Sequence, residues 1–283
     1  MRPDRSPTRR FAVFIAPARR RPALWRLVAG SGLAAAGWLA AALLLLPGAG
    51  DRQAAILRFL LSFGGLVLGL WLALRLLHRR RLASLLGPAG LEFRALAAGA
   101  GACLAVAAVS GMAASLLAPP VRGLSPDAWA RLLPLALPLV ALQCTAEELF
   151  FRGYLLQGLA ARFRSPLVWW LLPGLLFGAL HWNPADFGGA AALAVASATL
   201  LGLLLADITA RTGNLSAAIG IHLANNLAAL LVLSPPSTLD ALALLVLAPG
   251  PAGLAPLVRL DLATTLVAWG VWVAVRPQSG ASM

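Results

Sequence analysis

Two adjacent carboxylates, two imidazoles and an amide stand within apolar stretches of this sequence. They are Glu147, Glu148, His181, His222 and Asn226. A charge near the centre of a bilayer costs at least about 2.5–3.5 kcal/mol, so ionisable residues at that depth are usually functional or paired. A carboxylate beside a histidine can take a proton from water, and an imidazole and an amide one helical turn apart can donate hydrogen bonds to an oxyanion. The set therefore predicts hydrolysis inside a membrane.

The two adjacent glutamates have a possible counter-ion in their own helix. On a helix, Glu148 and Arg152 stand at i and i+4 on one face, so Arg152 can neutralise Glu148. Glu147 is turned about 100° away and has no comparable local partner. We therefore expect Glu147 to be the carboxylate that is free to act.

Each group also has a structural interpretation. A buried pair of Glu148 and Arg152 can simply hold helices together. A histidine at a helix end beside a tryptophan, like His181, is often an interfacial anchor. His222 and Asn226 can serve in interhelical hydrogen bonds.

Spacing along the chain puts these residues at one depth. If the chain turns at residues 164–165, Glu147 and His181 both lie about 24–26 Å from that turn at a rise of 1.5 Å per residue. Measured from the start of their own helix, His222 lies about 14 Å and Asn226 about 20 Å along it. We expect one cavity, entered from the cytoplasmic side.

Metal binding is the competing chemical account. Glu147, His181 and His222 make a plausible zinc set with an open position for water. The compact His-Glu-x-x-His motif is absent from the sequence. The residues alone leave open whether a divalent metal such as zinc is used.

Three short motifs stand in order on three predicted spans: Glu147-Glu148-x-x-x-Arg152, Phe177-x-x-x-His181 and His222-x-x-x-Asn226. They resemble the signature motifs of the CAAX prenyl protease and bacteriocin-processing (CPBP) family, also called the type II CAAX endopeptidase or abortive-infection family. The resemblance covers roughly residues 130–233. Each motif is short, but the ordered trio is specific.

The resemblance implies an eight-helix intramembrane protease. Glu147 and His181 would activate the water, His222 and Asn226 would form the oxyanion site, and the other Glu and the Arg of the first motif would support them. The implied substrates are membrane-associated proteins or peptides, either prenylated CAAX-type tails or other membrane peptides. The alternative is a non-catalytic membrane scaffold or bacteriocin-immunity protein.

Composition independently places the chain in a membrane. Of its 283 residues, 60% are hydrophobic and 12% charged, with a mean hydropathy of +0.84, whereas soluble domains carry about 25% charged residues. This excludes a soluble enzyme and predicts an all-α, polytopic bundle of about eight transmembrane helices. The expected spans are 27–46, 54–77, 95–118, 131–160, 166–182, 188–210, 216–233 and 257–275, and the segment 238–254 is expected to be re-entrant or interfacial.

The net charge is +13, and all of the basic residues that contribute to it are arginines, since the chain has no lysine. The arginines cluster at the ends of apolar segments, which favours contact with anionic lipid over nucleic acid. With the N-terminus inside, 17 arginines fall on the inner side and five on the outer. This distribution predicts a multi-pass protein of the cytoplasmic (inner) membrane with both termini in the cytoplasm.

The expected organisation has three parts: an Arg-rich cytoplasmic segment at 1–26, N-terminal transmembrane helices at 27–118, and a protease-like core with a C-terminal helix at 119–283. A transporter is disfavoured because no symmetric pair of broken helices is visible. Gly65 and Gly69 have the spacing of a helix-packing seam, a weak signal in a chain this rich in small residues. Asp207 is expected to pair with Arg211 at i+4.

Overall fold

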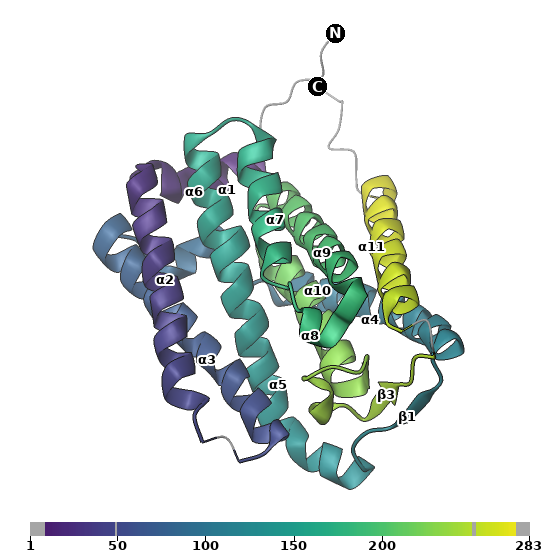
Figure 1. Cartoon of the computed structure of the whole chain (residues 1–283). Helices are drawn as coiled ribbons and strands as arrows, with labels where there is room; N and C mark the ends of the chain where they lie inside the picture. The colour runs from purple at the N-terminus through teal and green to yellow at the C-terminus, as the bar shows by residue number, and fades with distance from the viewer. Residues whose placement is uncertain (1–8, 49, 251–252, 276–283) are drawn as a thin grey trace.

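The computed structural model describes residues 9–48, 50–250 and 253–275. Residues 1–8 of the expected Arg-rich segment, and Arg276 in the inner count of arginines, lie outside this part. The described chain is a bundle of helices with one small sheet at one end (Figure 1). The all-α class and the polytopic bundle are confirmed, with that small sheet as an addition.

The first described element is a helix that the sequence analysis did not anticipate. Helix α1, Arg9–Arg19, buries Phe11, Phe14, Ile15 and Ala18 and exposes arginines. An apolar stripe at helical spacing explains why this Arg-rich piece folds onto the bundle. We call the end of the bundle that holds α1, the loop 79–92 and the turn 213–215 the α1 end.

Helices α2, Leu24–Leu45, and α3, Arg52–Ala73, form a close antiparallel pair, and α3 continues as a π-helical turn at Leu74–His78. A Cβ atom at Gly65 would fall on the carbonyl oxygen of Gly37, and one at Gly69 on that of Leu33. The backbones therefore touch directly, as small residues allow. The glycine spacing noted in the sequence is a true packing seam.

The segment that carries the first motif is one long helical run. Helix α4, Phe93–Leu117, leads through strand β1, Pro120–Arg122, to α5, Pro126–Glu148. Ser125 caps α5 by accepting a hydrogen bond from the backbone N–H of Ala128. The run continues as the π-helix η3, Leu149–Leu155, and the α-helix α6, Leu156–Arg162.

The remaining helices carry the other two motifs. They are η4, Leu167–Leu171; α7, Leu172–Ala179; α8, Pro184–Phe187; α9, Ala191–Thr212; α10, Ser216–Leu227; η6, Ala228–Val232; and α11, Ala255–Val275. Helix α7 packs on α9, and α10 packs between α4 and α5. The packing of α10 on α5 brings the first and third motifs together.

The sheet lies at the end of the bundle opposite α1 (Figure 1). Strand β3, Leu245–Leu247, pairs antiparallel with β1 and parallel with β2, Leu233–Ser234. Leu247, which belongs to this pairing, and Leu242, which precedes β3, are both buried. The described part of the segment 238–254 thus contains a short helical turn, Asp240–Leu242, and the strand β3.

Six helical runs in the described residues are long and apolar enough to cross a membrane. Two further apolar helices, Leu167–Ala179 and Ser216–Val232, are shorter. All eight expected segments are therefore helical, but a count of eight spans is not confirmed. The chain is an integral membrane protein by the length and composition of these helices.

Candidate active site

A buried ion pair stands at the junction of α5 and η3. Arg152 Nη1 lies 2.7 Å from Glu148 Oε1, and the two side chains are 2% and 0% exposed. Arg152 Nη2 donates to the carbonyl oxygen of Gly202 at 3.2 Å, and the guanidinium lies over the Phe177 ring, 4.5 Å from its centroid. The i, i+4 pairing expected from the sequence is confirmed. Because both side chains are buried, removal of either one would leave the other as an uncompensated buried charge.

His222 joins this pair from α10. Its Nδ1 lies 2.8 Å from Glu148 Oε1, the oxygen that also accepts from Arg152. Because a carboxylate facing an arginine only accepts hydrogen bonds, we assign the proton to Nδ1. His222 is buried, and its other ring nitrogen, Nε2, lies 3.6 Å from Glu147 Oε2. The ring orientation of His222 is therefore fixed by Glu148.

Glu147 is turned away from the ion pair, as expected. Its side chain is 14% exposed, and its buried Oε2 atom has no hydrogen-bond partner among the described residues. The 3.6 Å separation from His222 Nε2 is too long for a direct hydrogen bond. A buried carboxylate oxygen in this condition is suited to hold a polar ligand such as water.

Asn226 is held by a residue that the sequence analysis missed. Asn226 Nδ2 donates to Gln143 Oε1 at 2.9 Å, and the Cys144 thiol also donates to that oxygen at 3.2 Å. Gln143 is 7% exposed and stands one helical turn before Glu147. That i, i+4 spacing of a polar residue inside an apolar helix was the available signal.

His181 contacts the site through Phe177 and not through Glu147. Its Nδ1 donates to the carbonyl oxygen of Phe177 at 2.8 Å, and its ring lies 4.7 Å from the Phe177 ring. The same Phe177 ring lies 5.8 Å from that of His222. In the described residues the histidine in ion-pair range of Glu147 is His222, and no contact joins Glu147 to His181.

The depth estimate from the sequence assumed unbroken α-helix. Instead η4 is π-helical, α7 ends at Ala179, and the chain turns tightly where the backbone N–H of His181 donates to Gly178. The rise per residue therefore departs from 1.5 Å before His181. His181 is exposed at this turn, whereas His222 is buried.

The metal candidates do not form a ligand cluster. Among the described residues, no group of three His, Cys, Asp or Glu side chains lies close enough together to hold a metal ion. His222 uses Nδ1 for Glu148, and His181 uses Nδ1 for a backbone carbonyl. Nε2 of each histidine is left free, but Glu147, His181 and His222 do not form such a group in the described residues.

The helical run that carries the site is also anchored at the α1 end. Arg80 Nη2 donates to Gln157 Oε1 at 2.5 Å, and Gln157 Nε2 donates to the carbonyl oxygen of Leu85 at 3.2 Å. Burial lowers the pKa of Arg80 to about 10. These bonds tie α6 to the loop after α3.

A second polar contact lies away from the site. Arg211 Nε and Asp207 Oδ1 are 2.7 Å apart, which confirms the expected i, i+4 pair. Asp207 Oδ2 also accepts hydrogen bonds from Trp269 and Trp272 of α11, at 3.4 and 3.3 Å. Asp207 therefore fastens α11 to α9 and belongs to the scaffold.

Comparisons with known proteins agree with the position of this cluster. Residues 129–228 match the family described as type II CAAX prenyl endopeptidase Rce1-like. The protein named "Uncharacterized protein YyaK" of Bacillus subtilis (strain 168) is 40% identical over 96 residues, which are 34% of this chain and 32% of that relative. The match thus spans about a third of the length of that relative, and no solved structure matches the chain. All three motifs fall inside residues 129–228, the segment that matches the Rce1-like family model.

Proposed function

We propose that this protein is an intramembrane endopeptidase that hydrolyses peptide bonds of membrane-associated proteins or peptides with a water activated by Glu147. The observation that carries the proposal is the unpartnered, buried Oε2 of Glu147 opposite Nε2 of His222. These two atoms are 3.6 Å apart, so one water molecule beside them can form a hydrogen bond with each. Such a water is held and polarised before substrate arrives.

In the first step Glu147 takes a proton from this water, and the oxygen attacks the carbonyl carbon of the scissile peptide bond. The carbonyl oxygen becomes an oxyanion, which accepts a hydrogen bond from the amide of Asn226, and a second one from Nε2 of His222 when both ring nitrogens of His222 carry a proton. Glu147 passes this proton to the leaving nitrogen as the C–N bond breaks, and is a carboxylate again. The products are a carboxylic acid and an amine, and the acid then gives the remaining water proton to the amine or to solvent.

Two residues prepare the donors for this step. Glu148, charged opposite Arg152, holds Nδ1 of His222 so that Nε2 faces the reacting atoms. Gln143 holds one N–H of Asn226 and so fixes the plane of that amide, which leaves the second N–H for the oxyanion. Fixed donors stabilise the transition state without reorganisation.

We assign the second proton-transfer role to His181. Because its Nδ1 donates to the Phe177 carbonyl, Nε2 is the ring nitrogen that can exchange a proton. The exposed apolar side chains Leu180 and Trp182 flank it. A substrate segment held in the membrane can therefore approach along this apolar edge and meet His181 first.

We further propose that the α1 end faces the cytoplasm and that the membrane is the inner one. The arginine distribution supports this orientation, since 17 of 23 arginines fall on the α1 side of the predicted spans. The cleavage site would then lie below the cytoplasmic surface. Substrates of the CAAX type, which end at that surface, fit this placement.

The test compares new peptide N-termini in the membrane fraction of cells that express wild type, Glu147→Gln or Asp127→Asn. Asp127, an exposed carboxylate in the first turn of α5, the helix that also carries Glu147, is the matched control. Peptide ends present with wild type and Asp127→Asn but lost with Glu147→Gln identify a protease and its substrates. Identical profiles from all three folded proteins would reject the protease and favour a scaffold or immunity role.

A further inference from the structure

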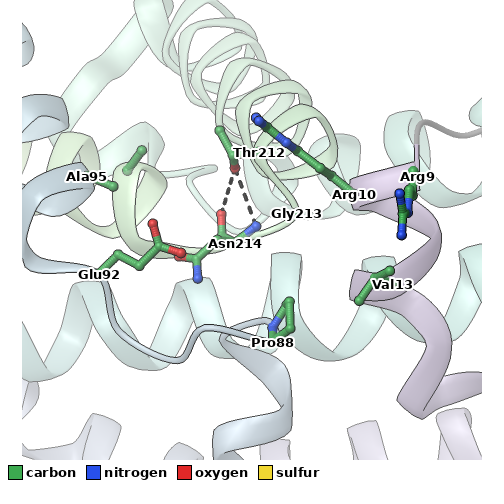
Figure 2. A pocket seen from close by; sticks show the side chains of 10 residues that line it. Arg9, Arg10, Val13, Pro88, Glu92, Ala95, Thr212, Gly213 and Asn214 are labelled. Atoms are coloured by element: carbon green, nitrogen blue, oxygen red, sulfur yellow. Dashed lines mark hydrogen bonds between the residues drawn. The ribbon is translucent and has the colours of Figure 1, made fainter. Parts of the chain in front are cut away.

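A cavity of about 680 Å³ opens at the α1 end, away from the candidate active site. Figure 2 shows three segments around it: α1, the loop that leads into α4, and the turn between α9 and α10. Its lining includes Arg9 and Arg10 from α1, Glu92 from the loop, and Asn214 from the turn. Nothing in the proposed peptidase mechanism uses this cavity.

Close backbone contacts preform the cavity. Gly213 has a φ of +69°, and a Cβ there would come within 2.8 Å of the carbonyl oxygen of Arg10. Gly87, with a φ of +110°, would bring a Cβ within 2.5 Å of the carbonyl oxygen of Gly213. Glycine is the residue that tolerates both the conformation and the approach. The three segments therefore meet backbone to backbone.

Hydrogen bonds fasten the loop to the turn. Asn214, 5% exposed, donates through Nδ2 to the carbonyl oxygen of Gly90 at 2.8 Å. The backbone N–H of Glu92 donates to Ser216 Oγ at 2.8 Å, and that of Leu215 donates to the carbonyl oxygen of Leu86 at 3.0 Å. The cavity floor is thus fixed without a ligand.

The charges around the cavity are opposite and unpaired. In the described part of the chain, neither Arg9, Arg10 nor Glu92 has an ion pair or a side-chain hydrogen bond. Figure 2 shows Arg9 and Arg10 on one side of the turn 212–214 and Glu92 on the other. A ligand that fills the space between them meets positive charge at one end and negative charge at the other.

The cavity lies at the depth of lipid headgroups. Glu92 immediately precedes one candidate membrane span, Phe93–Leu117, and Thr212 is the last residue of another, Pro184–Thr212. The apolar window of the first of these spans buries no residue inside the bundle, so α4 presents its surface to lipid. A lipid that lies along α4 therefore places its headgroup beside Glu92 and Ala95.

We propose that this cavity binds a phospholipid headgroup that carries both a phosphate and a primary ammonium, the phosphoethanolamine class. Arg9 and Arg10 would bind the phosphate, since guanidinium groups match phosphate oxygens. Glu92 would accept hydrogen bonds from the ammonium. The carboxylate repels a headgroup that is only anionic, so Glu92 supplies the selectivity.

The test measures lipid binding to the purified full-length protein in detergent by native mass spectrometry, with phosphatidylethanolamine and phosphatidylglycerol of the same acyl chains. Wild type is expected to bind phosphatidylethanolamine more tightly. Glu92→Gln should weaken that binding about ten-fold and abolish the preference, and Arg9→Gln with Arg10→Gln should weaken both lipids about ten-fold. All three side chains are exposed, so these variants should fold; their elution in size-exclusion chromatography checks this.

Arg164→Gln, in the exposed turn after α6, is the matched control and should bind both lipids as wild type does. Soluble phosphoethanolamine separates a lipid from a free metabolite. Competition only at concentrations far above those of the lipid supports the lipid. Competition at equal concentration overturns the lipid assignment. Equal binding of both lipids to wild type and to Glu92→Gln overturns the site itself.

Discussion

His222 Nδ1 donates to Glu148 Oε1 at 2.8 Å, and the same oxygen accepts from Arg152 at 2.7 Å. One carboxylate oxygen therefore links α5, η3 and α10 inside the bundle. The arrangement leaves Nε2 of His222 directed at Glu147, the neighbour of Glu148 in the chain. The two adjacent glutamates thus have different tasks. Glu148 fixes the orientation of the His222 ring, and Glu147 faces its free Nε2.

Replacing Glu148 by Gln should destabilise the protein strongly. Arg152 would remain buried without a counter-charge, and the loss from breaking such a pair is about 3–5 kcal/mol in the free energy of unfolding. Replacing both members, Glu148→Gln with Arg152→Met, should cost less than Glu148→Gln alone, because no uncompensated charge remains. Unfolding in detergent, followed for both single variants and the double variant, measures this. A double variant as unstable as the sum of the single variants would contradict the pairing.

The two histidines should respond differently to replacement by Leu. His181→Leu should lower the hydrolysis rate by about 100-fold or more with little change in melting temperature, because His181 is exposed and its ring bonds only a carbonyl of its own turn. His222→Leu should lower the rate and also the free energy of unfolding, by about 1–3 kcal/mol, because buried Glu148 loses a hydrogen-bond donor. Rates on a substrate peptide and melting curves distinguish the two; equal effects on stability would argue against the assignment.

Gln143→Leu should lower the turnover number about ten-fold through Asn226, whose amide loses its acceptor. In an Asn226→Ala background, Gln143→Leu should have no further effect on the rate. A merely structural role would lower the melting temperature equally in both backgrounds and leave the rate effects additive. The double-mutant cycle on the turnover number is therefore the decisive measurement.

Gly65→Ala should destabilise the contact between α2 and α3. The new methyl group would meet the carbonyl oxygen of Gly37 and the side chain of Ala41, and such overpacking costs about 1–3 kcal/mol. Gly101→Ala in α4 is the control, because nothing lies within 4 Å of its added Cβ. The control should be neutral or stabilising by up to about 1 kcal/mol, from helix propensity alone. Melting temperatures of the two variants in the same detergent test the seam.

Hydropathy was sufficient to find the long apolar helices of this protein, because burial in lipid imposes a local and continuous signal. The expected spans at 27–46 and 95–118 differ from α2 and α4 by one to three residues at each end. The strand β3 could not be found this way, since its three residues are apolar in an apolar chain and its partners are distant in sequence. Helix α1 was missed because its arginines obscured a short apolar stripe.

For the candidate site, helical spacing predicted the pair of Glu148 and Arg152, which depends on one helix only. It did not predict that His222 would bond Glu148, because that contact depends on how α10 packs on α5. The expectation that Glu147 and His181 lie at one depth assumed a uniform helical rise, and the π-helical turns and the end of α7 remove that condition. Local geometry was predictable, and geometry between helices was not.

The pairing of β3 with both β1 and β2 has a consequence for biogenesis. Val246 pairs with Val121, from before α5, and with Ser234, from just after η6. The strand that joins the two ends of the segment 121–234, which carries the three motifs, is therefore synthesised after every residue of that segment. Contacts between residues so far apart in the chain form slowly. The sheet can therefore form only after the whole segment that carries the three motifs has been synthesised, which makes its pairing a late step in folding.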